Sequence, residues 1–169
     1  MGSRLSFLDF EAYQSIIYNK TSLVLNMLRD LLGEETFFAG LKDFFSRHKY
    51  GAAGTGHFKM IMEKVAARDL TEFFALWFDS FVLPQVQVSY TVERKEAGPL
   101  LRVKVDQLNE VFVFPLWIAW LDEKGKSHRE KLVVERKSQQ FVQPLPGGVN
   151  KVIVNPDKAV PGKFFVSKD

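Results

Sequence analysis

Residues 84–92, Pro-Gln-Val-Gln-Val-Ser-Tyr-Thr-Val, decide the fold class of this chain. Their apolar side chains alternate with Gln, Ser and Thr, and this period of two is typical of a β-strand with one buried face. Before Pro84, apolar residues recur every three or four positions, which is the spacing of amphipathic helices. The change of period predicts an α+β protein, with a helical part over residues 1–83 and a β-sandwich over residues 84–169.

Four helices are expected before this boundary. The first covers residues 11–32 and is followed by Gly33, a residue suited to a helix C-cap. The second covers residues 34–47, and the third covers residues 57–67. A short fourth helix is expected to extend from a capping box at Asp69 to Phe78. The second helix carries an apolar, mainly aromatic stripe that we expect in the core, namely Phe37, Phe38, Leu41, Phe44 and Phe45.

After the boundary, short segments of strand character are separated by turn residues. Besides residues 86–92, the candidates are residues 100–105, 111–121, 129–135, 139–143 and 151–154. Six or seven short strands in succession are typical of an Ig-like antiparallel β-sandwich.

The composition limits the possible functions. With 169 residues, 46% of them hydrophobic, the chain can bury a real core. Its longest apolar run, residues 111–121, is shorter than the roughly 20 residues of a membrane-spanning helix, so no membrane partner is expected. The net charge of +3 is dispersed among acidic residues, which argues against a nucleic-acid partner. The absence of cysteine permits a reducing compartment but does not identify the compartment; the cytoplasm is slightly favoured.

No complete catalytic or metal motif occurs in the chain. The histidines are His48, His57 and His128, and none belongs to a His-Glu-x-x-His pair, so we expect surface histidines and no metal or cofactor bound by this chain itself. The Gly-rich turn over residues 51–56 lacks the Lys-Ser/Thr of a phosphate-binding loop. Glu11 and the pair Glu34-Glu35 fit solvated helix ends better than acid–base pairs.

Several segments together carry a family resemblance. They are Ile17-Tyr18-Asn19-Lys20, Leu25-Asn26-Met27-Leu28-Arg29, Leu32-Gly33-Glu34-Glu35, Arg47-His48-Lys49-Tyr50-Gly51, and Phe74-Ala75-Leu76-Trp77-Phe78 followed by Leu83-Pro84. In order and spacing they resemble the M1 family of zinc aminopeptidases, the gluzincins, over essentially the whole chain. The resemblance implies the end of a thermolysin-like catalytic domain followed by the family's β-sandwich domain.

The resemblance also implies a role for Tyr18. It matches the family's tyrosine that stabilises the tetrahedral oxyanion, a task suited to a neutral phenol. In that family zinc is held by His-Glu-x-x-His and a downstream Glu, and the motif Glu is the general base; none of these occurs in this sequence. The alternative for Tyr18 is a packed helix tyrosine with its hydroxyl at the surface.

We therefore expect the chain to be a fragment of a zinc aminopeptidase that hydrolyses N-terminal residues from peptides. Zinc and the peptide substrate would be bound in the full-length parent, the remainder of the catalytic domain would pack on these helices, and this chain alone would be inactive. Its tryptophans Trp77, Trp117 and Trp120 are candidates for buried packing. The alternative is a stand-alone protein-binding or scaffolding module with the family's fold and no catalysis.

Overall fold

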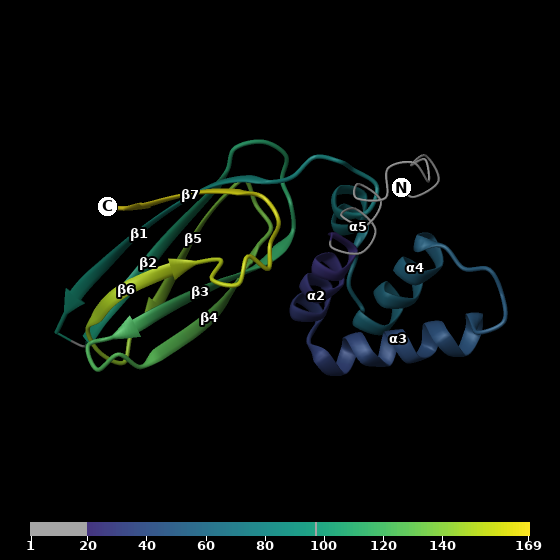
Figure 1. Cartoon of the computed structure of the whole chain (residues 1–169), viewed down its shortest axis with the longest axis horizontal. Coiled ribbons are helices and arrows are strands. Elements are labelled where there is room, and N and C mark those ends of the chain that lie inside the picture. Colours follow the sequence, from purple (N-terminus) through teal and green to yellow (C-terminus); the bar gives the residue numbers. More distant parts are fainter. Residues whose placement is uncertain (1–19, 97) are drawn as a thin grey trace, which may run out of the picture. The chain divides into compact units, whose positions relative to one another are not determined.

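The computed structural model describes residues 20–96 and 98–169 of the chain (Figure 1). Contacts within the chain divide it into two compact units, Met1–Val82 and Leu83–Asp169. The described part of the first unit is helical, and the second is built from strands. The fold is therefore α+β, with helices followed by a β-sandwich, as the change of period predicts.

The helical unit contains α2 (Thr21–Leu32), α3 (Glu34–His48), α4 (Thr55–Ala66) and α5 (Thr71–Trp77). These positions confirm the four predicted helices, although the part of the first one before Lys20 lies outside the described residues. Gly33 ends α2 as expected. Its φ of 86° belongs to the region that favours glycine, and its N–H donates to the carbonyl of Arg29 at 2.8 Å.

The start of α5 differs from the prediction. Leu70, not Asp69, is the N-cap residue, and its side chain is buried. The N–H of Leu70 donates to Oε1 of Glu63 at 2.9 Å, and the N–H of Thr71 donates to Oδ1 of Asp69 at 2.8 Å. The predicted capping box is therefore wrong, because the burial of Leu70 sets where the helix begins and two carboxylates outside the helix accept its first N–H groups.

The aromatic stripe of α3 lies only partly in the core. Phe37 is buried, and Phe44 is half-buried with its ring edge against Phe58 of α4. Phe38 and Phe45, however, are 53% and 61% exposed. The prediction that the whole stripe is buried is wrong for these two residues, because the packing of α2 and α4 against α3 leaves them at the surface of the unit.

The core of the helical unit is rich in aromatic contacts around α5. Phe74 meets Phe58 edge-on and stacks on Phe78, with ring centroids 6.1 and 4.8 Å apart, and Phe73 lies against Trp77. Each fully buried side chain of this size contributes about 1.5–3 kcal/mol. Helix α5 is therefore well anchored. The buried residues of the four helices include Val24, Met27, Leu28, Leu31, Ile61, Met62, Phe73, Phe74 and Trp77.

The described residues of the second unit form seven strands in two sheets (Figure 1). The strands are β1 (Gln85–Lys95), β2 (Gly98–Gln107), β3 (Phe114–Asp122), β4 (Ser127–Val134), β5 (Ser138–Pro144), β6 (Val149–Val154) and β7 (Lys163–Lys168). One sheet has the order β5-β2-β1-β7 and the other β4-β3-β6. All pairs are antiparallel except β1 with β7, which is parallel.

Strand β7 differs from the predicted antiparallel sandwich, because it pairs with β1 in parallel. Its apolar residues Phe164, Phe165 and Val166 stand in succession and give no alternating signal. The strand is held in place by long-range pairing, which begins at Gln85 opposite Lys163. Just before it, the N–H of Lys163 donates to the carbonyl of Pro84 at 2.9 Å.

The core of the sandwich uses alternate residues of the predicted strands. Val86 and Val88 of β1 are buried as expected, and Val88 lies opposite Val105 of β2. Strand β3 buries both of its faces over part of its length, since Pro115 and Ala119 are buried together with the inward residues. The inward residues include Leu101, Val103, Val105, Phe114, Leu116, Ile118, Trp120, Leu132 and Val134.

Candidate functional site

Tyr18, the catalytic residue expected from the sequence, lies outside the described residues, as does Glu11. The description begins at Lys20, two positions after Tyr18. Lys20 has helical backbone angles, with φ −62° and ψ −47°, and leads directly into α2. The start of α2 is therefore the described part of the chain that is nearest in sequence to Tyr18.

The ammonium group of Lys20 binds a carbonyl that is sixty positions away in the sequence. Its Nζ donates to the carbonyl oxygen of Ser80 at 2.8 Å, in a half-buried position. Burial lowers the pKa of Lys20, because loss of water disfavours the charged form. Lys20 takes part in none of the ion pairs between described residues. Among these residues its partner is the backbone carbonyl of Ser80.

The Ser80 carbonyl belongs to a well-fixed segment that follows α5. The N–H groups of Phe78 and Asp79 both donate to the carbonyl of Phe74, at 2.9 and 3.2 Å, and close the end of the helix. The hydroxyl of Ser80 then accepts the N–H of Val82 at 3.1 Å. Phe74 itself is buried in the core, so the acceptor for Lys20 follows a helix that packs inside the unit.

The histidines serve local structure. His48 at the end of α3 and His57 in α4 have ring centroids 5.1 Å apart, and Nδ1 of His57 accepts the N–H of Gly54 at 3.2 Å. Only His57 is exposed, whereas His48 and His128 are half-buried, so the expectation of surface histidines holds for His57 alone. Within residues 20–96 and 98–169, no cluster of three or more His, Cys, Asp or Glu side chains could hold a metal ion.

The other residues named from the sequence are brought to no common site. Glu34 and Glu35 are exposed in the first turn of α3, as expected for solvated helix ends. Trp77 and Trp120 are buried, which confirms their packing role. Trp117 is only half-buried, and the guanidinium of Arg129 lies over its ring at 5.2 Å from the centroid.

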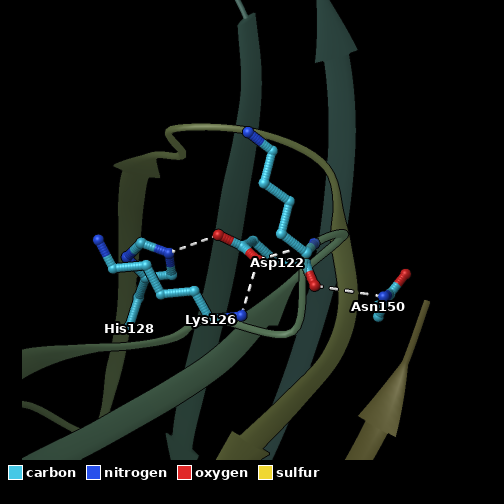
Figure 2. A network of polar contacts seen from close by, with 5 residues as sticks. Asp122, Lys126, His128 and Asn150 are labelled. Atoms are coloured by element: carbon cyan, nitrogen blue, oxygen red, sulfur yellow. Dashed lines mark hydrogen bonds and ion pairs between the residues drawn. The ribbon is translucent and has the colours of Figure 1, made fainter.

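Sequence reasoning missed a polar network around Asp122, at the end of β3 (Figure 2). Oδ1 of Asp122 accepts the N–H groups of Lys124 and Lys126, both at 2.9 Å, and Oδ2 lies 3.0 Å from Nε2 of His128. The side chain of Asn150 donates to the Asp122 carbonyl at 3.2 Å. The hydrogen bond to His128, followed by those from the turn, lowers the pKa of Asp122. The only signal in the sequence was the Asp-x-x-Gly turn itself.

One pocket of about 170 Å³ lies on a face of the four-stranded sheet. Its charged residues on β2 already have partners: Arg102 binds Glu93, and Lys104 binds Asp106 at 2.8 Å. Besides hydroxyl and amide side chains from β1 and β5, the polar part of its lining includes one further acidic residue; these residues are Ser89, Thr91, Gln140 and Asp169. No described helix is long and apolar enough to cross a membrane.

Comparison with known proteins relates the helical unit to a peptidase family. Residues 9–77 match the model of the peptidase family M1 domain. The alanine/arginine aminopeptidase of Saccharomyces cerevisiae is 26% identical over 137 residues, which cover 78% of this chain and 15% of that protein. Aminopeptidase N of Escherichia coli is 36% identical over 76 residues, which cover 45% of this chain and 9% of that protein.

A solved structure shares the fold of nearly the whole chain. The crystal structure of Legionella pneumophila aminopeptidase A in complex with aspartic acid superimposes with a TM-score of 0.76 at 18% identity. The match covers 94% of this chain and 19% of that one, so the helices and the sandwich follow each other in both. The chain spans 15% of the length of the yeast relative. Residues 9–77 thus match the peptidase family M1 domain, and the chain as a whole is similar to portions of aminopeptidases and shares the fold of one of them.

Proposed function

We propose that this chain is part of an aminopeptidase that removes N-terminal residues from peptides, with Tyr18 as its catalytic contribution. The observation that carries the proposal is the match of residues 9–77 to the M1 peptidase domain, since this segment contains Tyr18 and all four described helices. The names of the yeast and bacterial relatives, both aminopeptidases, support the same activity.

The chemistry assigned to Tyr18 is hydrogen-bond donation to an oxyanion. Hydrolysis adds a water oxygen to the peptide carbonyl carbon, places negative charge on the carbonyl oxygen, and then breaks the C–N bond to release the amine. A phenol with an ordinary pKa of about 10 keeps its proton at neutral pH and can donate it in a hydrogen bond. Because the charge exists only near the transition state, this interaction raises kcat more than it lowers KM.

Zinc, which the family resemblance implies, has no fitting ligand set among the described residues. We therefore assign the metal ligands and the general base to parts of a longer protein, and no step of the reaction to a metal held by α2–α5. The same longer protein would supply a cover for α3. Phe38 and Phe45 lie seven positions apart on this helix and are both more than half exposed, as expected where further catalytic-domain structure packs.

The test is the variant Y18F in the full-length natural protein that carries these residues. We expect kcat on a peptide with a free N-terminus to fall by about 10²–10³, the usual effect of removing one oxyanion donor, with KM little changed. The matched control is Y50F, which removes the hydroxyl of a tyrosine that is 93% exposed and leaves kcat unchanged. A wild-type kcat for Y18F would refute the role of Tyr18, and a natural protein without aminopeptidase activity would favour the scaffolding alternative.

A further inference from the structure

The turn between α3 and α4, residues 49–54, has a histidine close to each of its ends. His48 is the last residue of α3, and His57 is the third residue of α4. The N–H of Gly51 donates to the carbonyl of His48 at 3.1 Å, and the N–H of Gly54 donates to Nδ1 of His57 at 3.2 Å. The first hydrogen bond is made by the backbone alone, whereas the second depends on the state of an imidazole ring.

The hydrogen bond to His57 is one half of a capping box. In this motif the side chain of the third helical residue accepts the N–H of the N-cap residue, which is Gly54 here. The usual residues at the third position, Glu and Gln, keep an acceptor oxygen in mild acid. Imidazole can accept only while it is neutral, because both ring nitrogens of imidazolium are donors. The cap of α4 therefore depends on the charge of His57.

We propose that His57 is a pH-sensitive cap of α4, which holds the turn 49–54 at neutral pH and releases it in mild acid. A proton from the solvent binds the Nδ1 lone pair that accepts the N–H of Gly54. Two N–H groups then face each other, and the hydrogen bond is lost. The imidazole group of histidine changes its charge between about pH 5 and 8, so mild acid is sufficient. The inference is independent of the role proposed for Tyr18.

The charges of the two helix ends oppose a proton on His57. The first turn of an α-helix carries a partial positive charge, and the last turn carries a partial negative charge. A charged His57 is therefore disfavoured at the start of α4, whereas a charged His48 is favoured at the end of α3. The ring centroids of the two histidines lie 5.1 Å apart, so charges on both rings repel each other.

The elements around the two histidines offer no carboxylate to a charged His57. None of the ion pairs between described residues includes either histidine of this pair. On α3 the carboxylate of Asp43 binds Arg47 at 2.7 Å, and on α4 that of Glu63 lies 3.6 Å from Nζ of Lys59. The charged residue of α5, Glu72, is exposed. The other charged residues in the range 42–64 are cations, namely Lys42, Lys49 and Lys64.

The turn is open to solvent, so its order depends on few interactions. Residues 49–57 are all exposed, and Tyr50 is 93% exposed. Phe58, one position after His57, is buried and meets the rings of Phe44 and Phe74 edge-on. Loss of the hydrogen bond to His57 therefore opens the turn and the first residues of α4, while the helix from Phe58 onward stays packed.

Three variants separate the role of His57 from other effects of acid. H57Q places an uncharged acceptor at the third position of α4, so the cap stays in place when the pH falls. H57F keeps an aromatic ring beside His48 but removes the acceptor. H128Q is the matched control, because it replaces the half-buried histidine of the other unit and leaves α3 and α4 unchanged.

The experiment is amide hydrogen exchange of the full-length natural protein at about pH 7.5 and about pH 5.5. Because the chemical rate of exchange itself changes with pH, each segment is compared with an unfolded peptide of the same sequence, and the ratio of the two rates is its protection factor. We expect acid to lower the protection factor of residues 50–56 by about 3–10-fold in wild type and in H128Q, the usual effect of losing a helix cap. Residues 60–66 keep their protection. H57Q shows no loss, and H57F is poorly protected at both pH values.

Three results would overturn the inference. An equal fall in protection in H57Q and wild type would show that another group responds to acid. A wild-type turn with the same protection at both pH values would show that proton uptake by His57 does not release it. A loss of protection at residues 60–66 as large as at residues 50–56 would assign the effect to general unfolding of the helices. The proposed function of Tyr18 is tested separately by Y18F.

Discussion

His128 lies with Nε2 at 3.0 Å from the carboxylate of Asp122 and with its ring stacked on Trp120. The two rings are inclined by 11°, with centroids 5.6 Å apart. Because Asp122 also binds the N–H groups of Lys124 and Lys126, one carboxylate closes the turn between β3 and β4 and fixes the histidine across it (Figure 2).

This arrangement predicts a pH-dependent contribution of Asp122 to stability. The folded-state pKa of Asp122 is lowered, so its contribution is present above the unfolded value of about 3.9 and is lost as the pH falls through the folded value. We expect D122N, which keeps an oxygen for the turn but lacks the charge, to be less stable than wild type at neutral pH. The difference should shrink below about pH 4.

Urea unfolding at several pH values, followed by tryptophan fluorescence, measures this difference. The exposed Asp79 of the helical unit lies outside the network, so D79N is the control variant that leaves the network intact. If the free energies of unfolding of wild type and D122N differed by the same amount at every pH, the charge of Asp122 would not stabilise the fold.

The buried amide of Gln107 is expected to contribute strongly to the free energy of unfolding. Its side chain is 1% exposed, donates to the carbonyls of Phe112 and Arg136 at 2.9 and 3.1 Å, and accepts the N–H of Phe112 at 2.9 Å. We expect Q107L to lower the free energy of unfolding by about 2–4 kcal/mol, because each buried polar group left unpaired costs about 1–3 kcal/mol. Q140L, at an exposed position of β5, should change it by less than about 0.5 kcal/mol in the same denaturant titration. Equal effects of Q107L and Q140L on the free energy of unfolding would show that the buried hydrogen bonds of Gln107 do not stabilise the fold.

The close approach of Gly162 to Pro84, just before β7, predicts that a side chain at this position destabilises the sandwich. A Cβ at this position would lie 2.6 Å from the carbonyl oxygen of Pro84, which is backbone and cannot move freely. We expect G162A to lower the free energy of unfolding of the sandwich by about 1–3 kcal/mol. At Gly147 an added Cβ would meet nothing within 4 Å, so G147A should be near neutral. If calorimetry found G162A as stable as G147A, the close approach would be unimportant for folding.

The exposed face of α3 predicts self-association of this chain when it is produced alone. Phe38 and Phe45 present their rings to solvent, and two such residues on one helix form an apolar patch. Sedimentation velocity should show an average mass that rises with concentration for the wild-type chain and much less for F38S/F45S. Y50S changes an exposed aromatic residue outside this patch and should behave as wild type. A sharp monomer at high concentration for the wild-type chain would contradict the prediction.

Periodicity was sufficient to predict most elements of the fold. The spacing of Val24, Met27, Leu28 and Leu31 predicted α2, and the alternation of Val86 and Val88 predicted β1, because burial imposes these patterns locally. Strand β7 was not predicted from the sequence, because its stability comes from a distant partner strand and its apolar residues are consecutive. Phe38 and Phe45 were wrongly expected in the core, since a pattern gives the apolar side of a helix but not how much of it the neighbours cover.

The candidate site was less predictable than the fold. Lys20 was noticed only as part of a family motif, and no local rule connects it with a carbonyl beyond α5. The contact between Asp122 and His128 depends on the register of β3 and β4, which no local pattern in the sequence gives. The role of Tyr18 comes from the family resemblance and stays a prediction.

We propose that these residues form part of a larger zinc aminopeptidase. The most direct measurement is the intact mass of the natural polypeptide that carries them, with peptide mapping of its whole length and determination of its zinc content. The account predicts a mass several times the 19.4 kDa of this chain, bound zinc, and peptides that contain His-Glu-x-x-His and a downstream Glu ligand. A zinc-free polypeptide with a mass near 19.4 kDa would contradict it.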